Sequence, residues 1–133
     1  MRFMATALLT SLLLCTPALG KSEQGSEVDA TVQYLIGYVS ASGLTFIRNG
    51  SSYPSAEAAE HMNAKYRHFE NDIETPEDFI ERCASKSLIS GQPYLVIDER
   101  GEKIRTSDWL RAVLSQYRAQ NAGTMRVSPP SHP

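Results

Sequence analysis

Basic and hydroxyl side chains are grouped near the middle of this chain, and their types suit the binding of an anion. His61 and Lys65 stand four positions apart, so a helix through them places both side chains on one face. Arg48 comes just before Asn49-Gly50, which is the strongest short sequence signal for a two-residue hairpin turn. Tyr53 follows on the expected return strand. Charged donors and hydroxyl groups in this arrangement could complement negative charge.

The register of that hairpin decides where the Arg48 side chain points. A two-residue turn at Asn49-Gly50 pairs Arg48 with Ser51 and Phe46 with Tyr53. Because side chains alternate across a strand, Phe46 and Arg48 share the face that we expect to pack against the helices. Phe46 and Tyr53 should form an aromatic pair on this face. Arg48 is therefore expected on the covered side of the sheet.

A guanidinium on a covered surface needs a partner, because leaving the charge unpaired costs several kcal/mol. The sequence allows two interpretations for Arg48. In the first, Arg48 forms a structural ion pair with one nearby carboxylate, and the candidates are Glu57, Glu60 and Asp78. In the second, Arg48 acts together with His61 and Lys65 to hold an anionic ligand.

The segment CASKSLISG, residues 83–91, adds hydroxyl groups to the candidates. Ser85 and Ser87 crowd the end of an expected helix, where serines commonly satisfy terminal carbonyl groups. A Ser-Lys catalytic pair is not indicated, because neighbouring residues on a helix point in different directions. Cys83 lies on the apolar face and is typical of a small buried hydrophobe. We therefore name no catalytic residue, and the candidate ligand contacts are Arg48, Tyr53, His61, Lys65, Ser85 and Ser87.

Composition and spacing indicate no metal, cofactor, disulfide or nucleic-acid site. His61 and His68 on one helix would be separated by roughly 10 Å of helix rise, which is too far for one ion. Cys83 is the only cysteine after residue 20, so no disulfide framework is predicted. The formal net charge of −2 gives no electrostatic reason to bind nucleic acid or an anionic membrane.

The first 20 residues have the pattern of a cleaved signal peptide. Arg2 is followed by an apolar run, and Ala18 and Gly20 supply small residues at the −3 and −1 positions of a cut. The run is shorter than the roughly 20 residues that span a bilayer. Leu14 occupies the position before Cys15 where a lipoprotein has a small residue, so lipidation of Cys15 is not expected. The sequence predicts an exported chain without a membrane span after cleavage.

Helical and strand-like segments alternate in the rest of the chain. Apolar residues at helical spacing predict helices that begin near residues 27, 55, 76 and 107, with Ser55 and Thr75 as two of the N-caps. Residues 44–53 and 94–105 read as β-hairpins. The predicted fold is α+β, with about four helices packed on a small antiparallel sheet built from two β-hairpins. We expect a flexible lead-in over residues 21–26, a single domain over 27–120 and a disordered tail over 121–133.

Five separated blocks occur in a fixed order along the chain: FIRNG, EAAEH, TPEDFI, ASKS and SGQPY. In this combination the chain resembles the YfeK-like family of small exported bacterial proteins, from about Tyr34 to Tyr117. The resemblance implies a bacterial protein of the cell envelope, and with the predicted signal peptide it implies the periplasm. It supplies no catalytic residues and no assigned function.

Three hypotheses for function follow. The first is a non-enzymatic domain that binds a small anionic ligand or an envelope protein, which we favour. The second is a small hydrolase or transferase with His61 as general base, against which stands the lack of a recognisable nucleophile, metal or oxyanion motif. The third is a purely structural or assembly protein, in which Arg48 serves only the fold.

Overall fold

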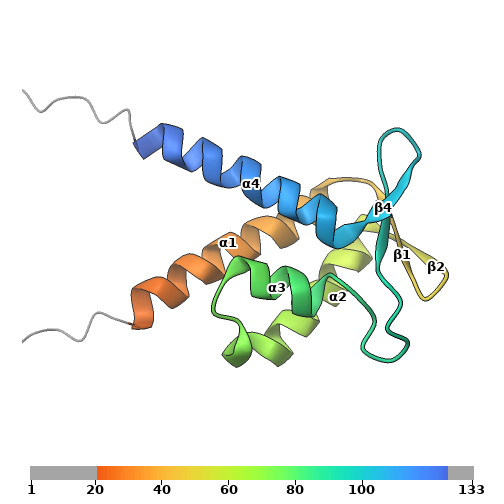
Figure 1. Cartoon of the computed structure of the whole chain (residues 1–133), viewed down its shortest axis with the longest axis horizontal. Coiled ribbons are helices and arrows are strands. Elements are labelled where there is room, and N and C mark those ends of the chain that lie inside the picture. Colours follow the sequence, from red (N-terminus) through yellow and green to blue (C-terminus); the bar gives the residue numbers. More distant parts are fainter. Residues whose placement is uncertain (1–20, 126–133) are drawn as a thin grey trace, which may run out of the picture.

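The computed structural model describes residues 21–125, so the predicted signal peptide with Cys15 and the last eight residues, 126–133, lie outside the described residues. The described chain forms an α+β fold with four α-helices and a four-stranded antiparallel sheet (Figure 1), as predicted. The elements in order are α1 (Lys21–Ala41), β1 (Thr45–Arg48), β2 (Ser51–Pro54), α2 (Ser55–Phe69), the short 3-10 helix η1 (Glu70–Asp72), α3 (Pro76–Cys83), β3 (Leu95–Ile97), β4 (Lys103–Arg105) and α4 (Thr106–Met125).

The two predicted hairpins are present and are joined edge to edge. The strand order is β2-β1-β3-β4, so β1 and β3 pair in the centre of the sheet. Figure 1 shows the sheet at one end of the molecule, with α1 and α4 extending away from it. The first hairpin has the predicted register, with Arg48 opposite Ser51 and Phe46 opposite Tyr53.

The turn of the first hairpin explains this register. Asn49 and Gly50 both have positive φ angles, 51° and 77°. A type I′ turn requires positive φ at both central residues, and its twist matches that of the flanking strands. The local sequence therefore fixes which residue faces which across β1 and β2.

The core lies where the helices meet one another and the inner face of the sheet. Helices α1 and α2 pack together, and α3 contacts α1, α2 and α4. The largest side chains that are completely buried come from α1, α3, β3 and α4, and they include Leu35, Phe79, Ile80, Val96 and Leu110. Each such side chain stabilises the fold by about 1.5–3 kcal/mol relative to its exposed state.

The predicted aromatic pair between Phe46 and Tyr53 is not formed, although the two residues face each other across the strands. The ring of Phe46 instead meets Trp109 of α4 edge to face, with the centroids 5.8 Å apart. Tyr53 is half-buried and lies under the guanidinium of Arg48. Helix α4 therefore supplies the partner of the Phe46 ring, and Arg48 supplies the partner of the Tyr53 ring. The alternation of residues along the strands predicts neither contact.

The ends of the domain are more helical than the sequence predicts. Residues 21–26, expected to be a flexible lead-in, form the first turns of α1. Helix α4 continues through Met125, so residues 121–125 are also helical and do not belong to a disordered tail. Once a helix has been nucleated by packing, each added residue gains one backbone hydrogen bond, so polar and exposed turns can extend it.

The two predicted N-caps have different outcomes. Thr75 caps α3 as expected: its Oγ1 accepts from the Asp78 backbone at 3.1 Å, and the Asp78 carboxylate accepts from the Thr75 backbone. The predicted cap Ser55 is wrong, because Pro54 occupies that position and has no side-chain cap bond. The Ser55 hydroxyl instead donates to the Ser40 carbonyl at 3.1 Å, which ties α2 to the end of α1.

A pair of glycine substitutions tests the importance of the first turn. Gly50→Ala should lower the free energy of unfolding by about 1–2 kcal/mol, because alanine disfavours a positive φ angle. The matched control is Gly37→Ala in α1, which should raise it by about 0.5–1 kcal/mol. A Cβ atom at either glycine meets no heavy atom within 4 Å, so sterics do not confuse the comparison. Urea denaturation measures both values, and equal effects of the two substitutions would contradict the proposed role of the turn.

Candidate anion-binding site

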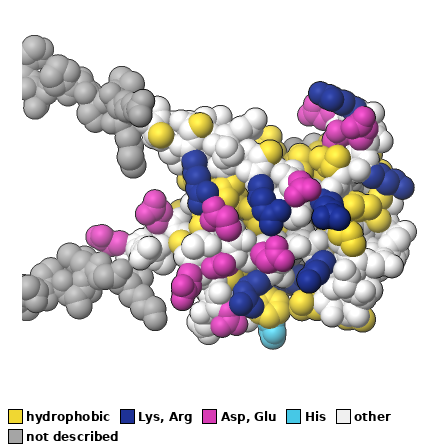
Figure 2. All heavy atoms as spheres, in the orientation of Figure 1, with side chains coloured by type: hydrophobic (Ala, Val, Ile, Leu, Met, Phe, Trp, Pro, Cys, Tyr) yellow, Lys and Arg dark blue, Asp and Glu magenta, His cyan; other side chains and the backbone are white. Residues whose placement is uncertain are grey.

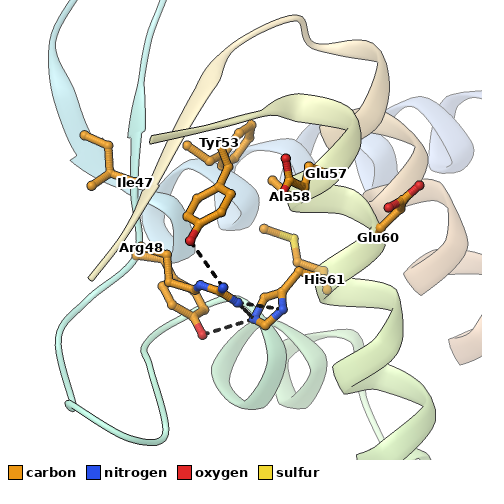
Figure 3. A pocket seen from close by; sticks show the side chains of 10 residues that line it. Ile47, Arg48, Tyr53, Glu57, Ala58, Glu60 and His61 are labelled. Atoms are coloured by element: carbon orange, nitrogen blue, oxygen red, sulfur yellow. Dashed lines mark hydrogen bonds between the residues drawn. The ribbon is translucent and has the colours of Figure 1, made fainter. Parts of the chain in front are cut away.

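Four elements bring together the side chains of one pocket. Arg48 comes from β1, Tyr53 from β2 and His61 from α2, while Tyr94 immediately precedes β3. They line a cavity of about 310 Å³. Figure 3 shows Arg48, Tyr53 and His61 pointing toward one another across the gap between the hairpin and α2.

Arg48 is held by neutral groups. Its Nη1 atom lies 2.8 Å from both ring nitrogens of His61. Its Nη2 atom donates to the hydroxyl of Tyr53 at 3.4 Å, and the guanidinium carbon lies 4.9 Å from the centroid of the Tyr53 ring. These contacts fix the guanidinium, but none of them neutralises its charge.

The ion pair predicted for Arg48 as one of two alternatives is not formed. Glu57 and Glu60 line the same pocket, but their carboxylates are directed away from the guanidinium (Figure 3). The third candidate, Asp78, accepts from the backbone at the start of α3. Within residues 21–125 the ion pairs join Arg111 to Glu81 and Asp108, and Arg118 to Glu77.

The remote ion pairs make the contrast with Arg48 clear. Figure 2 shows basic and acidic side chains lying side by side over one face of the molecule. The bridges from Arg111 to Glu81 and from Arg118 to Glu77 cross from α4 to α3, and their side chains are half exposed. Water and carboxylates therefore stabilise these surface arginines, whereas the partly buried Arg48 has neither a carboxylate partner nor full hydration.

Lys65 adds a second cation directly behind the pocket. It is 9% exposed, and its ammonium donates to the backbone carbonyl of Lys86 at 3.3 Å and to the Tyr94 hydroxyl at 3.4 Å. The same hydroxyl lies 3.5 Å from Nε2 of His61. A continuous row of contacts therefore runs from Tyr53 through Arg48, His61 and Tyr94 to Lys65.

Burial is the main cause of the pKa shifts around the pocket, and neighbouring cations add to two of them. Burial, followed by the charges of Arg48 and Lys65, lowers the pKa of His61 below 6.5, so the imidazole is neutral at pH 7. Burial is also the main cause that lowers the pKa of Lys65, with a smaller contribution from Arg48, and the Cys83 thiol acts in the opposite direction. Burial raises the pKa of Tyr94, which keeps its hydroxyl protonated as a donor.

The two predicted serines lie outside this pocket. The buried Ser87 hydroxyl accepts from the Asn49 side chain at 3.4 Å and from the backbone of Ile89 and Ser90, so it shapes its own loop. The Ser85 carbonyl accepts from the Tyr94 backbone at 3.0 Å, and this residue supports the site only through its main chain. The structure thus brings together Arg48, Tyr53 and His61, places Lys65 one contact away, and leaves the serine hydroxyls apart.

Tyr94 is the contact that the sequence analysis missed. The sequence pattern places Tyr94 only at the beginning of a strand. Nothing in the block SGQPY indicates that its hydroxyl contacts His61 and Lys65. Its position depends on the pairing of β1 with β3, which joins segments about fifty residues apart and has no local signal.

Other chemistry has little support in the described chain. Cys83 is completely buried, and burial raises the pKa of its thiol to about 11, so it is a poor nucleophile. Across residues 21–125, no group of three or more His, Cys, Asp or Glu side chains could hold a metal ion. Over the same range, no helix is long and apolar enough to cross a membrane.

Comparison with known proteins gives the chain a family. A family model described as a family of unknown function, DUF5329, matches residues 26–118. The chain belongs to the DUF5329 family. The chain is also similar to the uncharacterized protein YfeK of Salmonella typhimurium strain LT2, with 34% identity over 88 residues. That alignment covers 65% of this chain and 71% of the relative, and it confirms the resemblance to YfeK-like proteins.

The DUF5329 segment contains the whole pocket, from Phe46 on β1 to Tyr94 before β3. No solved structure matches the chain. The contacts inside this pocket are therefore the basis for its proposed ligand.

The lowered pKa of His61 predicts how stability changes with pH. The unfolded chain binds a proton at His61 more readily than the folded protein, so protonation favours unfolding. The free energy of unfolding should fall as the pH decreases below 6.5, and His61→Gln should remove part of this decrease. The matched control is His68→Gln, because His68 is exposed and belongs to the same helix. Urea denaturation at pH 7.5 and pH 5.5 measures the change, and identical pH dependence in all three proteins would contradict the assignment.

Proposed function

We propose that this DUF5329 protein binds a small anionic ligand in the pocket formed by Arg48, Tyr53, His61 and Tyr94, without transforming it chemically. One observation carries the proposal: among residues 21–125, Arg48 contacts His61 and Tyr53 and the nearly buried Lys65 contacts Tyr94 and a backbone carbonyl, but neither cation contacts a carboxylate. A bound anion would supply the missing negative charge.

The energetics favour such an occupant. A partly buried cation loses hydration, and neutral hydrogen-bond partners recover only part of that free energy. An anion beside Arg48 could accept charge-assisted bonds from the guanidinium, which are about twice as strong as neutral ones. The hydroxyls of Tyr53 and Tyr94 add two donors at the same end of the pocket.

Binding is better supported than catalysis. His61 is neutral and could act as a general base, which is what the hydrolase or transferase hypothesis requires. However, the pocket residues include no serine, threonine or cysteine, and the Cys83 thiol is buried. A purely structural role for Arg48 would need a locked counter-charge, and its partners are instead an imidazole and a phenol.

We also propose that the protein acts in the bacterial periplasm. The support is the N-terminal pattern of Arg2, an apolar run and small residues at positions 18 and 20. The YfeK relative comes from a bacterium, Salmonella typhimurium, which suits the proposed bacterial origin. A small anion that enters the cell envelope would then be the ligand that the protein meets.

A thermal-shift assay with carboxylates, phosphates and sulfonates at constant ionic strength tests the anion site. An anion that binds only the native state must raise the melting temperature. Arg48→Gln should weaken binding by about 1.5–3 kcal/mol, since it removes a charged hydrogen-bond donor. This corresponds to a roughly ten- to hundredfold increase in Kd.

Two further variants keep this test decisive if Arg48→Gln is unstable. Tyr53→Phe removes a single hydroxyl from the pocket and should weaken binding less than Arg48→Gln does. Arg67→Gln removes the same charge from an exposed position on α2 and should leave binding unchanged. If no anion raises the melting temperature, or if Arg67→Gln matters as much as Arg48→Gln, the proposed function is wrong.

Export can be tested on the full-length chain. Expression in a bacterium with a periplasm should give a periplasmic product that begins at Lys21, because signal peptidase cuts after a small residue such as Gly20. Intact-mass spectrometry of the periplasmic fraction identifies the cut. An intact chain recovered from the cytoplasm, or a product lipidated at Cys15, would contradict the proposed location or route.

A further inference from the structure

The pocket has two unlike ends, and this difference restricts the ligand. Arg48, His61 and the two tyrosine hydroxyls form the polar end. The remaining wall is mainly apolar, and its side chains are those of Phe46, Ala58 and Met62. Phe46, Ala58 and Met62 belong to the buried core, so this wall is part of the rigid framework and not a mobile surface.

The carboxylates of Glu57 and Glu60 give the pocket a negative rim. Both residues line the cavity, both are exposed, and neither takes part in an ion pair within the described residues. They precede His61 on α2, whereas Arg48 lies on β1 and Lys65 follows His61 by four residues on α2, behind Tyr94. A ligand with one negative charge can place it beside Arg48 and away from the rim. A ligand with further negative charges would bring some of them toward the glutamates, where like charges repel.

The volume sets the size of the ligand. The cavity of about 310 Å³ lies at the lower limit for small-molecule pockets. At roughly 30 Å³ for one water molecule in the liquid, it has room for about ten waters or a similar number of non-hydrogen atoms. An acidic group alone would leave the apolar wall uncovered.

We propose that the ligand is a small amphiphilic monocarboxylate, whose carboxylate meets Arg48 and whose aliphatic or aromatic body covers the wall of Phe46, Ala58 and Met62. This inference rests on the proposed anion site and narrows it to one class of anion. The guanidinium fork suits both carboxylate and phosphate. A phosphate group carries a charge of about −1.5 to −2 at pH 7, which the negative rim disfavours.

Isothermal titration of the purified protein at fixed ionic strength and pH 7.5 tests this ligand class. The probes are benzoate and hexanoate as amphiphilic monocarboxylates, acetate as the acidic group alone, and benzyl alcohol as the uncharged body. Inorganic phosphate and citrate represent multiply charged anions. Benzoate and hexanoate should bind at least roughly tenfold more tightly than each of the other probes, because burial of each additional CH₂ group strengthens binding several-fold.

The double variant Glu57→Gln/Glu60→Gln tests the rim directly. It should tighten the binding of phosphate and citrate at least roughly fivefold relative to benzoate, because two repulsive charges are removed. Both side chains are exposed, so the variant should fold as the wild type does. Glu99→Gln, in the turn of the other hairpin and outside this pocket, is the matched control and should leave the ratio unchanged.

The outcomes separate the two proposals. If phosphate, citrate or acetate binds as tightly as benzoate, or if the double variant leaves the affinity ratio unchanged, the monocarboxylate inference is wrong and the anion site stands. If benzyl alcohol binds as tightly as benzoate, the pocket does not recognise charge and the proposed function fails as well. If none of the probes binds, both proposals are overturned.

Discussion

The pairing of β1 with β3 is the interaction on which the site depends. It aligns Ile47 with Leu95, and the same register, continued by one residue, sets Tyr94 beside Arg48. The Tyr94 backbone is held on both sides, since its N–H donates to Ser85 and its carbonyl accepts from Thr106. Without this pairing the two hairpins would be separate and marginally stable ribbons. With it, one sheet presents a cation and a phenol toward α2.

Arg48 has no carboxylate partner among the described residues, although Glu57 and Glu60 line the same pocket. Arg111 and Arg118 of α4 form ion pairs with carboxylates of α3. These side chains are exposed, so each pair contributes little stability but also loses little hydration. The glutamates of α2 are directed away from Arg48, whose contacts are one phenol and one imidazole, while a phenol and a backbone carbonyl contact Lys65. Completely buried side chains such as Phe79 and Leu110 provide the stability that tolerates this arrangement. The absence of an ion pair at Arg48 therefore supports the proposed binding function over a purely structural one.

Sequence reasoning succeeded where the determining physics is local. Asn49 and Gly50 fixed the first hairpin through their φ angles, and Thr75 with Asp78 fixed the start of α3 through a capping box. It failed where partners come from distant segments. The ring of Phe46 packs against Trp109, and the Tyr94 hydroxyl contacts the ammonium of Lys65. Both contacts join segments that are far apart in the sequence, so no local pattern predicts them. The structure places His61 and Tyr94 between Arg48 and Lys65, and no local sequence pattern indicates that these cations have neutral partners.

His61 lies between the two cations, Arg48 and Lys65, and its charge state affects how well the folded chain accommodates them. A protonated imidazole between Arg48 and Lys65 would add a third cation, and the lowered pKa of His61 avoids this. The neutral ring accepts a hydrogen bond from the guanidinium and so holds it in the direction of the cavity. A lysine or arginine at position 61 would carry a permanent charge and would have no acceptor for this hydrogen bond.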